Sequence, residues 1–131
     1  KHLQNQPSAK TSLEQAGRLI EAEKVDLAFL LLKQAASGGI AEAQRMLGEM
    51  YDPRLFSAET SPLPSANGEI AANHYRSAAD QGDAAAMRNL GILMIEGQHG
   101  DAPDVAAGRD LLEKAVTAGD DEAETYLEKL K

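Results

Sequence analysis

The stretch AADQGDAAAMRNLG, residues 78–91, indicates the fold, because related stretches occur elsewhere in the chain. Residues 35–48 read AASGGIAEAQRMLG, and the two stretches share two leading alanines, a glycine, an arginine and a final Leu-Gly pair. A weaker third copy keeps Ala115, Gly119, Ala123 and Leu127. Self-similarity at a period of about 20–50 residues is typical of solenoids built from one repeated unit. The sequence therefore predicts a helical or mixed repeat array rather than a single irregular domain.

The composition narrows this prediction to an all-α fold. The chain has 131 residues, of which 43% are hydrophobic and only 4% aromatic. Alanine and leucine, both strong helix formers, make up much of the apolar content. The net charge of −8 argues against a nucleic-acid partner, because phosphate binding needs a basic surface. There is no cysteine and no long apolar run, so no disulfide, thiolate metal site or membrane-inserted helix is expected.

The cellular compartment stays open at this point. The sequence starts at Lys1 and carries no signal peptide, from which we expect a fragment or processed form of a longer chain. Both the bacterial periplasm or cell envelope and the cytoplasm are compatible with this composition.

Hydrophobic spacing and helix breakers predict seven helices in antiparallel pairs. Residues 1–10 are expected to form a flexible tail or linker end, and Thr11 with Glu14 has the spacing of a capping box that starts the first helix. The second helix, 25–37, is apolar on nearly all sides and is expected to lie between neighbours. The remaining helices are predicted at 41–51, 68–80, 84–96, about 103–118 and 121–130. The single domain, 11–131, then consists of units 11–37, 41–80 and 84–118 and a capping helix, 121–130.

Small and large residues alternate in columns that repeat along the chain. The small column holds Ala28, Ala71 and Gly108, and the large column holds Leu32, Tyr75 and Leu112. Gly48 and Gly91 lie inside predicted helices, where glycine costs about 1 kcal/mol relative to alanine. A recurring cost of this kind needs a packing reason. We therefore expect a partner helix to cross each glycine too closely to leave room for a methyl group.

These motifs resemble the Sel1-like repeat family, a member of the tetratricopeptide-like superfamily of helical repeats. The family's first helix, A-x-x-x-L-G-x-x-Y-x-x-G, is matched by Ala43, Leu47, Gly48 and Tyr51, and again by Ala86, Leu90, Gly91 and Gly97. The end of its second helix, K-A-A-x-x-G, is matched near residues 33–39, 78–82 and 114–119. The resemblance covers about residues 25–127 and implies a right-handed α-α superhelix.

The chain departs from the family pattern in three places. Glu128 stands where Leu-Gly is expected, as a terminal capping helix would allow. The connection 52–66 is about six residues longer than its counterpart in the next unit, from the difference between the repeat spacings of 43 and 37 residues. The family's common cysteines are absent.

No catalytic site or cofactor is predicted. The chain has no cysteine and no G-x-S-x-G turn, and no two of His2, His74 and His99 have the i, i+4 spacing of a helical zinc pair. We expect His74 to be partly buried with a hydrogen-bond partner and His99 to be exposed. Acidic residues cluster at Asp120, Asp121, Glu122 and Glu124, which we interpret as a capped helix start rather than a cation site.

The resemblance implies a concave groove lined by the first helix of each pair. The candidate partner-binding residues there are Gln44, Arg45, Glu49, Met87, Arg88, Ile92 and Ile95. Arg45 and Arg88 recur in one column and could bind the carboxylates of an acidic peptide, or each could pair with a glutamate of its own helix, such as Glu42 or Glu49. Ile92 and Ile95 either contact a partner or pack under a neighbouring loop.

The long connection 52–66 supplies two more candidates, Leu55 and Phe56. A loop of this length in a compact domain is usually functional or mobile. These two apolar side chains either fold back to cover helix ends or form part of a partner site.

The family resemblance implies a non-enzymatic scaffold or adaptor that binds a protein or peptide partner. A regulatory module of a larger bacterial envelope or signalling protein is the alternative. A hydrolase of the β-lactam type is a more remote one, because some cysteine-rich relatives have been linked to that activity whereas this chain has neither the cysteines nor a nucleophile motif.

Overall fold

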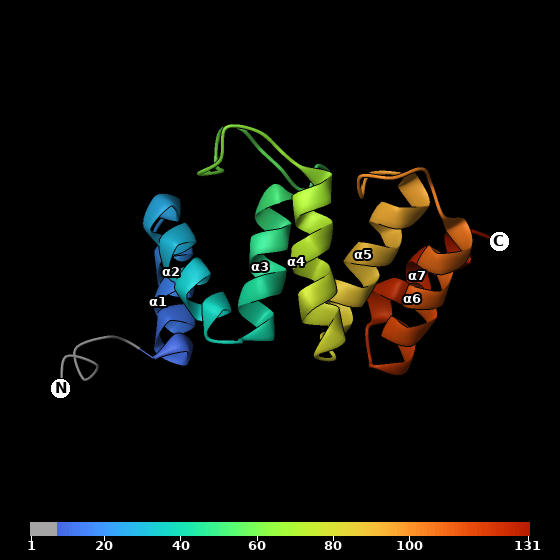
Figure 1. Ribbon diagram of the computed structural model, residues 1–131, viewed down its shortest axis with the longest axis horizontal. Coiled ribbons are helices and arrows are strands. Elements are labelled where there is room, and N and C mark those ends of the chain that lie inside the picture. Colours follow the sequence, from blue (N-terminus) through green and yellow to red (C-terminus); the bar gives the residue numbers. More distant parts are fainter. Residues whose placement is uncertain (1–7) are drawn as a thin grey trace.

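The computed structural model describes residues 8–131, and all regular structure in that range is helical. Figure 1 shows the helices following one another along the long axis of the molecule, with α1 and α2 at one end and α6 and α7 at the other. Their bounds are α1 Ala9–Glu21, α2 Val25–Ser37, α3 Ala41–Tyr51, α4 Gly68–Asp80, α5 Ala84–Glu96, α6 Val105–Thr117 and α7 Asp121–Lys129. The all-α repeat fold is therefore confirmed. His2 and Pro7 lie outside the described residues.

The helices pack as pairs that stack on one another. Helices α1 and α2, α3 and α4, and α5 and α6 form the pairs, and successive units meet through α2–α3, α4–α5 and α6–α7. We call these three contacts the first, second and third joints. The predicted columns form the core: Leu32, Tyr75 and Leu112 are fully buried, and the small column beside them is buried as well.

Close helix crossings explain the glycines inside α3 and α5. A Cβ atom on Gly48 would lie 2.5 Å from Cε1 of the buried Tyr75 ring, and one on Gly91 would lie 2.7 Å from the carbonyl oxygen of Gly108. The expected close approach is confirmed at both positions. Gly17 has the same place in α1, but a Cβ there would meet no atom within 4 Å. The first pair is thus less closely packed at this column than the other two.

Two helix starts differ from the sequence predictions. Helix α1 begins at Ala9, two residues before the expected capping box, because Ser8 provides the cap and its hydroxyl oxygen accepts a hydrogen bond from the Thr11 amide. The prediction that residues 1–10 form a tail is therefore wrong for the last residues of that range. At α6, Asp104 is the N-cap, so Pro103 lies just before the helix rather than within it.

Helix α2 is not enclosed on all sides, which corrects another expectation. Leu27 is 53% exposed and Leu30 is 60% exposed, while Ala28 and Leu32 face the core. The array is a single row of pairs, so the outer face of this helix has no neighbour among the described residues.

The connection 52–66 rises above the helix row and extends toward the first pair, as the green segment between α3 and α4 in Figure 1 shows. Its two ends are held together, because the amide of Asn67 donates to the carbonyl of Tyr51 at 2.8 Å. The connection is thus a loop closed at its base, with its tip placed over the first joint.

Candidate functional site

A cavity of about 520 Å³ opens between the first helix pair, α3 and the 52–66 loop. We call it the loop cavity. The first pair and its turn contribute Ile20, Glu23 and Val25, and α3 contributes Met46, Glu49 and Met50. The loop contributes Leu55, Phe56, Ser57, Glu59, Thr60, Ser61 and Pro62.

The walls of the loop cavity are mainly apolar and partly open to solvent. Leu55 is 53% exposed, so part of its apolar side chain faces the opening of the cavity. Met46 and Met50 are flexible thioethers that can adapt to irregular shapes. Such a surface suits the burial of an apolar side chain from another molecule.

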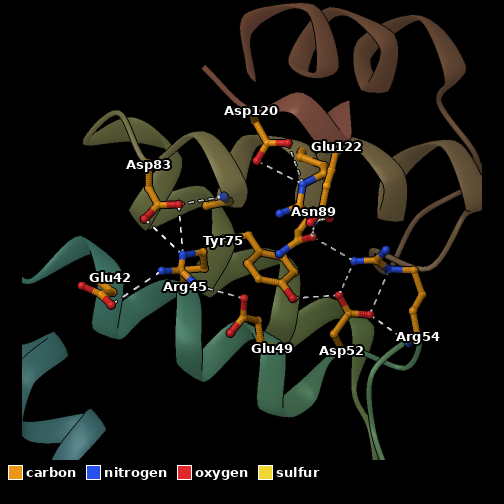
Figure 2. Close-up of polar contacts among 12 residues, drawn as sticks. Glu42, Arg45, Glu49, Asp52, Arg54, Tyr75, Asp83, Asn89, Asp120 and Glu122 are labelled. Carbon is orange, nitrogen blue, oxygen red and sulfur yellow. Dashed lines mark hydrogen bonds and ion pairs between the residues drawn. The ribbon is translucent and has the colours of Figure 1, made fainter. Parts of the chain in front are cut away.

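A buried polar network holds the base of this loop. Asp52 is fully buried, and its carboxylate accepts a hydrogen bond from the Tyr75 hydroxyl at 2.7 Å and from Nη2 of Arg54 at 2.8 Å. The same guanidinium donates to Oδ1 of Asn89 in α5 at 3.2 Å. Figure 2 shows these groups converging at the end of α3. Burial, with Asp52 nearby, raises the pKa of Tyr75, so its hydroxyl stays a donor.

Each of the two recurring arginines binds the aspartate that caps the next unit's first helix. Nε of Arg45 lies 3.2 Å from Asp83, and Nε of Arg88 lies 3.0 Å from Asp120. Asp83 and Asp120 also accept from the amides of Ala86 and Ala123, each at 2.8 Å. We call these contacts arginine–cap pairs (Figure 2). They cross the second and third joints, and the side chains are largely buried.

The own-helix alternative for the arginines is confirmed for Arg45, which also contacts Glu49 at 3.0 Å and Glu42 at 3.9 Å. Arg88 instead contacts Glu122, at 3.1 Å, and Oδ1 of Asn89, at 2.9 Å. Both guanidinium groups therefore already have intramolecular acceptors.

The first joint lacks an arginine–cap pair. Ser12, Ala16 and Gly17 of α1 have the spacing of Ala43, Leu47 and Gly48 in α3, which aligns the two helices. In that alignment Glu14 stands in the arginine column, and Ile40, without a capping side chain, stands where Asp83 and Asp120 cap later helices. The loop cavity spans this joint.

Apart from the two arginines, the structure separates the sequence-predicted site residues into three groups. Glu49, Leu55 and Phe56 come together at the loop cavity. Gln44 is bonded to Nδ1 of His74 through its side-chain oxygen at 2.8 Å. The remaining apolar candidates pack into the core around α6 and α7, namely Met87, Ile92 and Ile95.

Two expectations about apolar residues can now be settled. Ile92 is only 5% exposed and is not a surface contact, but it packs against residues of α6 and α7 rather than under a neighbouring loop. The 52–66 loop does fold back toward the helices, but Leu55 stays half-exposed rather than covering a helix end. Phe56 is partly buried in the wall of the loop cavity.

Sequence reasoning missed the Asp52–Arg54–Tyr75–Asn89 network and the part of the loop cavity formed by the first pair. One signal did exist: Glu23 lies six residues after Gly17, just as Gly97 lies six residues after Gly91. A glutamate in a glycine column marks a local departure from the repeat.

Of the two histidine predictions, one is confirmed and one is wrong. His74 is partly buried, bonded to Gln44 and stacked on Tyr51 with ring centroids 5.9 Å apart, as expected. His99 is only 8% exposed, so the expectation of an exposed side chain is wrong. The reason is that its loop packs on the start of α4, where a Cβ on Gly68 would overlap the carbonyl of Gln98.

The acidic cluster at the start of α7 is a capped helix start, as interpreted from the sequence, because Asp120 caps the helix and binds Arg88. Within residues 8–131, no three potential metal-ligating side chains gather as a metal site would require. In the same range, no helix combines the length and apolarity needed to cross a bilayer.

Comparisons with known proteins agree with this architecture. A search of curated proteins found no match. A Sel1 repeat protein from Oxalobacter formigenes has a similar crystal structure, with a TM-score of 0.76 and 26% identity over 92% of this chain and 88% of that one. The Helicobacter pylori cysteine rich protein B is similar in fold, with a TM-score of 0.63 and 17% identity over 90% of this chain and 93% of that one. The family model for the Sel1 repeat matches residues 17–40, 41–83 and 84–120, and the chain therefore belongs to the Sel1 repeat family.

Proposed function

We propose that this chain is a non-enzymatic interaction scaffold and that a peptide or protein segment binds in the loop cavity. Members of the Sel1 repeat family are generally protein-interaction scaffolds. The observation that carries the proposal for this chain is the apolar wall of the loop cavity, in which Leu55 is half-exposed. Exposed apolar surface of this kind gains free energy when a partner covers it.

The arginine column is less suited to the role. Arg45 is held by Asp83 and Glu49 and Arg88 by Asp120, all at least partly buried carboxylates, and an acidic peptide would have to compete with those contacts. Removing a charge-assisted partner from a desolvated guanidinium is costly, which supports a structural role for both residues.

The experiment is a display selection of random dodecapeptides on the full 131-residue chain, followed by affinity measurements on two matched variants. Leu55→Ser changes the loop cavity, whereas Leu30→Ser changes a leucine of similar exposure on α2 that does not line it. Burying a leucine contributes about 1.5–3 kcal/mol, so we expect Leu55→Ser to weaken the selected peptides about tenfold or more.

Leu30→Ser should leave the affinities within about twofold of the parent chain. Equal binding by the parent chain and Leu55→Ser, or loss of binding in Leu30→Ser alone, would exclude the loop cavity as the site.

A further inference from the structure

Among residues 8–131, the charged side chains that line the loop cavity all have one sign. They are Glu23 from the α1–α2 turn, Glu49 from α3 and Glu59 from the loop, with no lysine, arginine or histidine among the described lining residues. Glu49 is paired with Arg45 at 3.0 Å. Glu23 and Glu59 are exposed and form no ion pair or side-chain hydrogen bond with any described residue. Two uncompensated carboxylates therefore flank the apolar surface, one on the α1–α2 turn and one on the 52–66 loop.

The backbone at Glu23 is held in a conformation that glutamate disfavours. Its φ is +63°, and every other positive φ between residues 8 and 131 belongs to a glycine. In the corresponding column, Gly97 has φ +71°. Glycine adopts this left-handed region without steric penalty, whereas a Cβ atom crowds the following carbonyl oxygen. Glycine would therefore fit the turn better, but it would not place a carboxylate beside the cavity.

We propose that the loop cavity accepts a segment in which an apolar side chain is flanked by lysine or arginine, with Glu23 and Glu59 facing the cationic groups. The proposal rests on the proposed function, because it names the class of segment that the same cavity binds. Charge complementarity carries it: the apolar wall takes the apolar side chain, and the carboxylates favour neighbouring cations and disfavour anions. The net charge of −8 adds long-range attraction for a basic segment.

The test uses labelled synthetic peptides with blocked termini, in which a central leucine or serine is flanked by lysines, serines or glutamates. We measure their binding to the full chain by fluorescence anisotropy at low and high salt. The lysine–leucine–lysine peptide should bind most tightly, and its advantage over the serine-flanked peptide should shrink as salt screens the ion pairs.

Three variants test whether the loss of a carboxylate weakens peptide binding without changing the fold. Glu23→Gln and Glu59→Gln should each weaken the lysine-flanked peptide about threefold and together about tenfold, as expected for rim ion pairs. Glu113→Gln, an exposed glutamate of α6 outside the cavity, is the matched control and should change nothing.

Glu23→Gly is the most informative variant, because it removes the carboxylate and also removes the steric penalty of a side chain at a positive φ. We expect it to lose the same affinity as Glu23→Gln while the melting temperature stays the same or rises by up to about 4 °C. Wild-type affinity of Glu23→Gly for the lysine-flanked peptide would overturn the proposal.

The outcomes also separate this inference from the proposed function. If serine- or glutamate-flanked leucine peptides bind as well as the lysine-flanked one, and Leu55→Ser abolishes that binding, then the inference fails and the proposed function stands. If no leucine peptide binds in a manner that depends on Leu55, both fail.

Discussion

The first and second helix pairs are built on the same columns but are held together differently. In the second pair, Gly48 lies against the Tyr75 ring, and Arg45 binds Asp83, the N-cap of α5 in the next unit. In the first pair, a Cβ atom on Gly17 would meet no neighbouring side chain or helix among the described residues, and Glu14 stands in the arginine column. The positions that tighten the array elsewhere are thus relaxed in the first of the two units that border the loop cavity.

The residues that specify the architecture are therefore different from those that specify the site. Where the chain conforms to the repeat, its side chains hold neighbouring helices close. Where it departs from the repeat, at Glu23 and in the long 52–66 loop, the departures line one cavity.

The largest expected effect comes from Asp52, the buried centre of the second pair. Asp52→Ala leaves the Tyr75 hydroxyl and the Arg54 guanidinium without their acceptor, which should lower the free energy of unfolding by about 3 kcal/mol. Urea denaturation measures the loss. Glu21 has the equivalent place in α1 and is exposed, so Glu21→Ala should change stability by less than about 0.5 kcal/mol. Similar losses in both variants would mean that the two pairs do not differ in this way.

The next test exchanges one hydrogen for a methyl group at matched positions. Gly48→Ala pushes against a fully buried ring and should destabilise the chain by about 2 kcal/mol. Gly17→Ala meets open space and gains helix propensity, so it should stabilise the chain by up to about 1 kcal/mol. Thermal unfolding of the two variants gives the signs, and a stabilised Gly48→Ala would contradict the close crossing.

A smaller effect is expected at the second joint itself. Asp83→Ala removes both the helix cap and the partner of Arg45 and should cost about 1.5 kcal/mol. Asp83→Asn keeps the capping oxygen and loses only the charge, so it should cost about half as much. Unchanged stability of Asp83→Asn, measured by chemical denaturation, would show that the ion pair contributes nothing to the joint.

The smallest effect is a pH dependence confined to the second pair. Burial lowers the pKa of His74 below its ordinary value of 6.5, so the unfolded chain binds this proton more readily than the folded one. Stability should therefore be complete above pH 6.5 and fall as the pH drops below it. His74→Leu introduces the leucine that the neighbouring units have at this position. The free energy of unfolding, measured by denaturation between pH 7.5 and 5 to bracket the ordinary pKa, should then depend less steeply on pH. An unchanged slope would rule out His74 as its source.

The fold could be predicted because its determinants are periodic. Gly48 and Gly91 recur at one spacing together with alanines and leucines, so local sequence already reports the helix crossings. The site could be predicted only in part. Leu55 and Phe56 were recognised from an apolar stretch in a long loop, but the opposite wall of the loop cavity depends on where that loop lands.

The Asp52–Arg54–Tyr75–Asn89 network could not be predicted from the sequence, because it also depends on how distant segments pack. Asp52 and Arg54 are close in the chain, yet Tyr75 and Asn89 reach them only through the stacking of α3, α4 and α5. Likewise Arg45 meets an aspartate 38 residues away, a distance that no helix periodicity links.

Asp83 and Asp120 each belong to two units at once, since each caps one helix and binds an arginine of the preceding unit. In a linear array, stability is the sum of each unit's own folding and its coupling to its neighbours. A carboxylate that caps one helix and also binds an arginine of the previous unit adds to that coupling. The first joint has no such shared residue, so α1 and α2 should exchange their amide hydrogens and unravel under force before the remainder of the array, which would open as one cooperative block.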